Sequence, residues 1–391
     1  MEKKKLPSGI LSILFLVLVS YSALAVLNLL PLYFEHIGGQ PGEIGFYVGL
    51  FSLAAFLSRP LGGWLLSQQK PKKIMAVGLI LMLGSTVSYL FINRLDWILG
   101  LIRLLHGAGF SLFILAALLI VVLKTQEKER AYAIGIVSVG FMLPLLIVPA
   151  LGEEVIERFG YFFFFLLAIA IAVIPLFYAL AAKVHLPRTS AREEGRGSSF
   201  FHLLRQKRII LIVVSTFLFE LGLSASLSFV PLLAHSGSSM RAGFFYTFLG
   251  LTAVLLRIYG GKKLKFWGST QLLFPGFIFL SLGCLLTSLS YNDWMLSFSG
   301  VVWGIGAGIL YPHLTALSVE GVHSKDKAKV LSLFASSVDL GFALGPLSFG
   351  WLSQLLGLRN AFFLFAVFIV VFSLPLISIL YVKLTKEHSL P

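Results

Sequence analysis

The sequence has little of what an enzyme or a soluble binding protein depends on. Its 391 residues include one cysteine, Cys284, which excludes an internal disulfide and a zinc or iron–sulfur site built from cysteines. Charged residues make up 12% of the chain. The cytoplasmic segments contain no Gly-x-x-x-x-Gly-Lys-Ser/Thr phosphate-binding sequence, so ATP is not the expected energy source. The polar groups are too scattered to pair a nucleophile with a base, and we expect no enzyme activity, cofactor or metal.

Long apolar runs occupy most of the chain instead. Hydrophobic residues make up 58% of it, and a mean hydropathy of +0.93 lies far above that of soluble domains. Runs of about 20 apolar residues cross a bilayer as helices, whereas barrel strands are shorter and alternate. We place twelve spans near residues 9–34, 43–67, 72–93, 97–123, 130–155, 160–182, 208–233, 241–262, 270–290, 294–320, 328–354 and 359–384.

Positive charge is distributed unevenly along these spans. The net charge is +14, from 31 Lys and Arg against 17 Asp and Glu. With the N-terminus inside, nearly all of the basic residues fall in cytoplasmic segments or at their helix ends. The exceptions are Arg94, Arg103, Arg158, Arg241 and Arg359. This asymmetry predicts a multi-pass protein of the cytoplasmic (inner) membrane with both termini in the cytoplasm, so the basic charge meets the lipid bilayer and no nucleic acid is expected.

The second half of the chain repeats the first. Three residues recur at a constant offset of 198: Arg59, Gly62 and Gly63 return as Arg257, Gly260 and Gly261. The triplet Gly107-Ala108-Gly109 returns as Gly306-Ala307-Gly308, and Pro31 as Pro231, at nearly the same offset. A duplicated apolar chain is typical of secondary transporters, in which the substrate site lies between two like bundles.

One polar stretch separates the two copies. Residues 183–207 are charged and rich in serine and glycine, without apolar periodicity, which is the composition of a flexible linker. We therefore expect an N-terminal six-helix bundle over residues 1–182, a cytoplasmic linker over 183–207, and a C-terminal six-helix bundle over 208–391.

Six plus six helices, a basic linker and Arg-x-x-Gly-Gly at the inner ends of spans 2 and 8 resemble the major facilitator superfamily. The resemblance implies an all-α membrane protein whose 12 transmembrane helices form two pseudo-symmetric six-helix bundles. The family's loop motif between spans 2 and 3, G-x-x-x-D-R-x-G-R-R, is matched at Gly63, but Ser67 and Gln68 replace its Asp and Arg. The resemblance assigns a gating or conformational role to Arg59, Gly62, Gly63, Arg257, Gly260, Gly261, Gly341, Gly345 and Pro346.

Two further motifs extend the resemblance. The segment from Arg103 to Gly109 in span 4 is similar to the family pattern R-x-x-Q-G-x-G, which implies a role for Arg103 in proton coupling. The segment from Gly341 to Pro346 in span 11 is similar to a G-x-x-x-G-P pattern that the family associates with export. The first four spans are similar to those of the arabinose-efflux-like, metallophore- and drug-exporter branch of the family.

Two acidic residues lie deep within the spans, away from the span ends, where an ionisable group is costly and marks a candidate site. Glu220 falls near the middle of span 7, and its helix neighbours Thr216 and Ser224 cannot neutralise it. Asp339 lies in span 11 beside Ser336. We assign proton coupling to Glu220 and Asp339 together with Arg103. The alternative is that each makes only structural hydrogen bonds to neighbouring helices.

A substrate cavity is expected to be lined by other polar groups inside the spans. Pro312 interrupts the backbone ladder of span 10, and interrupted helices commonly line transporter cavities. Packing is the alternative reading for each of these residues. The candidates are Tyr21, Asn28, His106, Tyr311 and His313.

These observations favour a secondary active transporter that works by alternating access. We expect a monomeric, proton-coupled antiporter for efflux of a small organic molecule, in which protonation of Glu220 favours one orientation. One alternative is a proton-coupled importer of an anionic metabolite, with Arg103 binding its carboxylate. Another is a receptor or lipid-handling protein that has the same fold and does not transport.

Overall fold

The computed structural model describes residues 8–125, 127–181, 200–236, 240–260, 269–323 and 326–388. These residues form helices joined by short turns, and no strand occurs among them. Twelve helical segments are long and apolar enough to cross a membrane. The prediction of an all-α chain with twelve spans is confirmed, and the predicted ends lie within about four residues of the observed ones.

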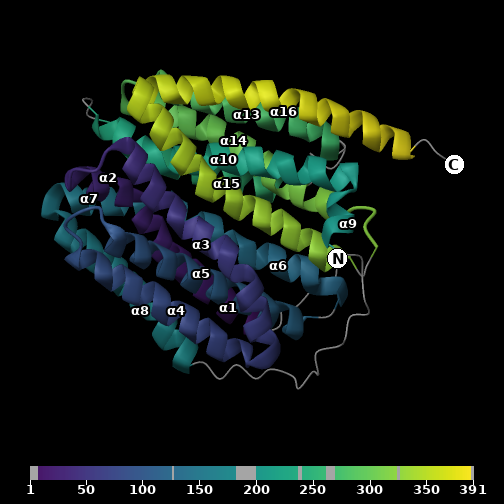
Figure 1. Cartoon of the computed structure of the whole chain (residues 1–391), viewed down its shortest axis with the longest axis horizontal. Helices are drawn as coiled ribbons and strands as arrows, with labels where there is room; N and C mark the ends of the chain where they lie inside the picture. Colours follow the sequence, from purple (N-terminus) through teal and green to yellow (C-terminus); the bar gives the residue numbers. More distant parts are fainter. Residues whose placement is uncertain are drawn as a thin grey trace. The chain divides into compact units, whose positions relative to one another are not determined.

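The first half of the chain supplies six of these segments, whose helices Figure 1 draws in purple to blue. Two of them are composite, because a short 3₁₀ turn divides the span into two helices. The helices are α1 (Ser8–Val26), η1 (Leu27–Leu29), α2 (Leu30–His36), α3 (Pro41–Gln68), α4 (Pro71–Ser88), η2 (Tyr89–Phe91), α5 (Trp97–Lys124), α6 (Glu127–Met142), η3 (Leu143–Leu146), α7 (Val148–Phe159) and α8 (Tyr161–Ala181).

The second half supplies the other six. Residues 182–199, which include most of the expected linker, and Gly261 lie outside the described residues. The helices are α9 (Phe200–Leu204), α10 (Lys207–His235), α11 (Ala242–Leu255), the π-helical turn η4 (Leu256–Gly260), α13 (Ser269–Ser288), α14 (Asp293–Val319), α15 (Lys327–Leu356) and α16 (Leu358–His388).

The chain divides into two compact units. The first contains residues 1–39 and 50–192, and the second contains residues 40–49 and 193–391. The start of α3 therefore belongs with the second unit, where Gly45 lies against the backbone of Pro346 in α15. The linker limits expected from composition stay a prediction.

Proline explains the composite spans. Proline lacks a backbone N–H, and its ring clashes with the preceding turn, so it interrupts a helix or starts a new one. Pro31 lies in the first turn of α2, and Pro144 and Pro149 lie at the starts of η3 and α7. Pro231, the repeat partner of Pro31, lies inside the continuous helix α10. The span is therefore interrupted at the proline in the first copy of the repeat and continuous through it in the second.

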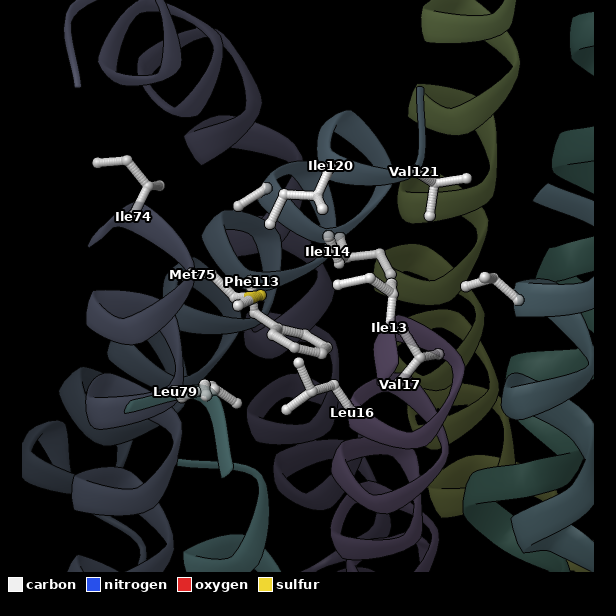
Figure 2. Close-up of a cluster of buried hydrophobic side chains, with 14 of the residues drawn as sticks. Ile13, Leu16, Val17, Ile74, Met75, Leu79, Phe113, Ile114, Ile120 and Val121 are labelled. Atoms are coloured by element: carbon white, nitrogen blue, oxygen red, sulfur yellow. The ribbon is translucent and has the colours of Figure 1, made fainter. Parts of the chain in front are cut away.

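A hydrophobic core holds the first unit together (Figure 2). Buried side chains from α1, α4 and α5 converge in it. Phe113 of α5 lies at its centre, between Met75 and Leu79 of α4 and Leu16 of α1. Ala133 and Val137 of α6 and Ala179 of α8 complete the cluster. Lipid is as apolar as these side chains, so close packing rather than exclusion from water stabilises the contact.

Each copy of the glycine triplet supplies one glycine to a close helix contact in its unit, from the third position of the triplet in the first copy and from the first position in the second. In the first unit a Cβ on Gly109 of α5 would lie 2.8 Å from the carbonyl oxygen of Gly78 in α4. In the second, a Cβ on Gly306 of α14 would lie 3.0 Å from the carbonyl oxygen of Gly276 in α13. Glycine is needed at both places because the neighbouring backbone leaves no room for a side chain.

Candidate functional site

Ionisable residues from four helical segments of the second unit interact with one another inside the membrane-spanning region. Glu220 lies about fifteen residues before the end of α10 at His235, and Arg257 about fifteen residues after the start of α11 at Ala242. Since the helix rises 1.5 Å per residue, both lie roughly 22 Å from the loop that joins the two helices. Electrostatic contact joins Glu220 to Arg257 and to Asp339 of α15, and joins Arg257 to Tyr311 of α14.

Glu220 and Asp339 are buried in this cluster, with 2% and 6% of their surfaces exposed. Close packing of α10 on α15 holds them there. A Cβ on Gly341 would lie 2.7 Å from the Cβ of Glu220, and the Ser224 hydroxyl donates a hydrogen bond to the Gly341 carbonyl oxygen at 3.0 Å. Gly341 belongs to the glycine face of α15 that is predicted as a conformational motif. The same face therefore packs directly against the Cβ of Glu220.

Arg257 contributes a positive charge to the cluster. It lies in η4, a π-helical turn, and such turns are frequent at functional sites. Its guanidinium carbon lies 5.4 Å from the centre of the Tyr311 ring, within the range of a cation–π interaction. Its Nε and Nη2 atoms are buried and find no hydrogen-bond acceptor in the part of the chain that the structure describes. A buried donor left unsatisfied costs about 1–3 kcal/mol.

The cluster combines groups of opposite charge. Arginine stays protonated in proteins, so Arg257 can neutralise a carboxylate beside it. A buried carboxylate is costly unless a cation or a bound proton compensates it. The two carboxyl groups are therefore candidates for proton exchange.

A second polar cluster lies in the first unit, around Tyr89 of η2. The Arg103 guanidinium donates a hydrogen bond from Nη1 to the Tyr89 hydroxyl at 3.3 Å. That hydroxyl also lies 3.1 Å from Nδ1 of His106. The Arg103 guanidinium carbon lies 5.1 Å from the centre of the Phe51 ring. Because Arg103 can only donate, Tyr89 is satisfied when it donates its own proton to His106 Nδ1.

Replacing Tyr89 with Phe should destabilise the first unit. The ring is fully buried, and the change removes the hydroxyl that binds both Arg103 and His106. We expect the free energy of unfolding to fall by about 1–3 kcal/mol, measured by denaturant unfolding of the purified protein in detergent. Tyr259→Phe is the control, because the Tyr259 side chain is 71% exposed. Equal stability of the Tyr89→Phe variant and the wild type would contradict the proposed network.

The remaining cavity candidates occupy separate positions. The Tyr21 ring lies 4.4 Å from that of Phe141 and 5.6 Å from that of Phe110, measured between centres. Asn28 lies half-buried in η1. His313 of α14 bonds through Nδ1 to the Ile309 carbonyl oxygen at 2.6 Å. Their role in substrate binding stays a prediction.

The gating residues also differ in their surroundings. Gly62 of α3 is buried, and a Cβ there would lie 2.8 Å from the side chain of Leu115, whereas Gly63 faces open space. Arg59 lies half-buried in regular α-helix, while its repeat partner Arg257 lies in a π turn. The structure thus brings Glu220, Asp339, Arg257 and Tyr311 together in one unit, and Arg103 and His106 together in the other.

Sequence patterns alone do not predict that Arg257 lies near Glu220, because they interpret Arg257 as part of the repeated motif at a cytoplasmic helix end. One feature of the sequence does indicate the pairing. Glu220 and Arg257 are each about fifteen residues from the loop between α10 and α11, so the two residues lie at the same height on their helices.

Comparison of the sequence with known protein families and with individual transporters identifies the family of this chain. The sequence profile of the Major Facilitator Superfamily matches residues 10–286 and 265–391. The chain is 25% identical over 358 residues to the multi-drug resistance efflux pump PmrA homolog of Lactococcus lactis, covering 88% of each chain. It is 23% identical over 383 residues to the staphylopine export protein of Staphylococcus aureus, covering 92% of this chain and 93% of that protein.

Solved structures agree on the fold. The nucleoside transporter NupG superposes with a TM-score of 0.78 at 14% identity, over 95% of this chain and 99% of that one. A bacterial homolog of the human lysosomal transporter Spinster superposes with a TM-score of 0.75 at 15% identity, over 97% of each chain. The sequence-based resemblance and fold class are confirmed. The chain belongs to the Major Facilitator Superfamily and is a multi-pass membrane transporter, not an enzyme.

Proposed function

We propose that the chain is a proton-coupled antiporter that exports small organic molecules by alternating access. The buried cluster of Glu220, Asp339 and Arg257 carries this proposal, because its two carboxyl groups can take up and release a proton beside a fixed positive charge. The curated relatives named above are efflux proteins, which supports the outward direction. Motif similarity alone supports a role for Arg103 of the first unit in the same coupling.

Topology completes the proposal. The distribution of basic residues favours the cytoplasmic membrane, with both termini in the cytoplasm. We propose that the monomer is the working unit, since each chain contains both repeats.

Reconstituted liposomes with an imposed pH gradient test this function. Ciprofloxacin, which is fluorescent, serves as the probe, and protein-free liposomes measure its passive accumulation. A proton antiporter concentrates the probe on the acidic side, by about tenfold per pH unit for each proton exchanged. Accumulation on the alkaline side would instead identify an importer. A gradient that changes nothing, together with absent counterflow, would favour a non-transporting protein.

A further inference from the structure

Two prolines at matching positions of the repeat deprive equivalent backbone carbonyls of their usual helical donor. Proline lacks the N–H group that normally bonds the carbonyl oxygen four residues earlier. For Pro31 that oxygen belongs to Leu27, and for Pro231 it belongs to Leu227, exactly 200 residues later in both cases. Both leucines are buried. Since a buried carbonyl without a donor is costly, each copy needs a donor from elsewhere.

The first copy takes this donor from its own backbone. The Leu30 N–H donates to the Leu27 carbonyl oxygen, three residues earlier, which is the bond of a 3₁₀ turn. The α-helix therefore ends at Val26, and the chain continues through η1 into α2. In this copy the span is interrupted because the backbone itself supplies the missing hydrogen bond.

The second copy takes the donor from a neighbouring helix. The Tyr246 hydroxyl of α11, which is fully buried, donates a hydrogen bond to the Leu227 carbonyl oxygen. With this oxygen satisfied, α10 continues as an α-helix through Pro231 to His235. The residue 198 positions before Tyr246 is Val48, which has no hydroxyl group. The duplicated sequences thus differ in the one side chain that keeps the helix continuous.

We infer that the Tyr246 hydroxyl is a releasable latch on the tip of α10, residues 230–235. When the hydroxyl leaves, the Val230 N–H donates to the Leu227 carbonyl oxygen, as the Leu30 N–H does in the first copy, and the tip takes the interrupted form. The carbonyl oxygen has a donor in both forms, which is how prolines are tolerated in membrane helices. A 3₁₀ turn within a span commonly marks a hinge.

This inference rests on the proposed function, because alternating access requires elements with two arrangements. Leu227 lies seven residues after Glu220 in α10, about 10 Å along the helix. The hinge therefore lies between the acidic cluster and the loop that joins α10 to α11. Because the latch binds neither the proton nor the substrate, it changes the rate of transport and leaves the final concentration ratio unchanged.

Hydrogen–deuterium exchange of the purified, full-length protein tests the latch. Tyr246→Phe keeps the ring and removes the donor, so peptides that cover the tip of α10 should exchange about tenfold faster. Peptides of α13 should exchange as in the wild type. Pro231→Ala restores an N–H for the Leu227 carbonyl oxygen, so Tyr246→Phe should have little effect in that background. Tyr259→Phe is the control, because the Tyr259 side chain is 71% exposed.

Probe counterflow in liposomes tests the role of the hinge in transport. Pro231→Ala favours the continuous helix and should slow counterflow about tenfold, the effect of one additional hydrogen bond in one form. Accumulation driven by a pH gradient should reach the wild-type ratio, only later. Pro375→Ala is the matched control, because Pro375 also lies inside a helix, α16, but is exposed. Its counterflow should equal that of the wild type.

Local and general effects separate a latch from a merely structural tyrosine. If Tyr246→Phe speeds exchange equally in all peptides, or has the same effect with Ala at position 231, the inference is overturned. Unchanged exchange at the tip or a wild-type rate of counterflow for Pro231→Ala would overturn it as well. In each case, probe accumulation by the wild type on the acidic side of liposomes would still support a proton antiporter.

Discussion

Replacing Glu220 with Gln should abolish accumulation driven by a pH gradient and leave downhill exchange intact. The amide has the shape of the protonated carboxyl group, so α10 can pack on α15 as before, but it cannot release a proton. The wild type should concentrate the probe about tenfold per pH unit for each proton, and the variant should reach equal concentrations on both sides. Probe counterflow in the absence of a gradient should continue, since the amide keeps the shape and the neutral charge of the protonated carboxyl group.

Glu43→Gln is the matched control for this experiment. Glu43 is exposed, and its carboxylate accepts a hydrogen bond from the Gln40 backbone N–H at 3.0 Å, which an amide oxygen can also accept. We expect gradient-driven accumulation by this variant to equal that of the wild type. Wild-type accumulation by the Glu220→Gln variant would remove Glu220 from the coupling site, and loss of counterflow would show a binding defect instead.

The sequence predicts the spans and the repeat well, because both depend on local composition. An apolar run of sufficient length forms a membrane-spanning helix however the other helices are arranged around it. Each copy of the glycine triplet also supplies one glycine to a close helix contact within its own unit, Gly109 against Gly78 and Gly306 against Gly276. The two glycines hold different positions in the triplet, so the repeat predicts that small residues pack there but not which of them does.

Contacts between residues far apart in the sequence are harder to predict. Arg257 interacts electrostatically with Glu220 although the two lie on different helices, and this pairing depends on helix packing rather than on any local motif. Likewise, Pro31 interrupts its span while Pro231 does not, although the two residues are repeat partners. A proline allows either outcome, and the packing around it decides which occurs.

Close helix contact in the first unit depends most strictly on Gly107 of α5. A Cβ at this position would approach the carbonyl oxygen of Phe51 in α3 closer than 3.0 Å, a separation that real Cβ atoms essentially never show. The obstructing atom belongs to the backbone, so no side-chain rotation can relieve the contact. Any larger residue must therefore push α5 away from α3 and disturb Arg103 and His106, which lie on the same helix.

Gly107→Leu should accordingly cause the largest loss of stability among single substitutions in the first unit. Overpacking of a tight contact costs about 1–3 kcal/mol and occasionally more, and here both helices are long and fixed by other contacts. Gly84→Leu is the matched control, since Gly84 of α4 is exposed with open space around it and leucine favours helix over glycine by about 1 kcal/mol. In denaturant unfolding in detergent, the first variant should lose stability and the second should keep or gain it. A similar loss in both would mean that leucine in these helices is harmful in itself, and that the contact of α5 with α3 does not require glycine.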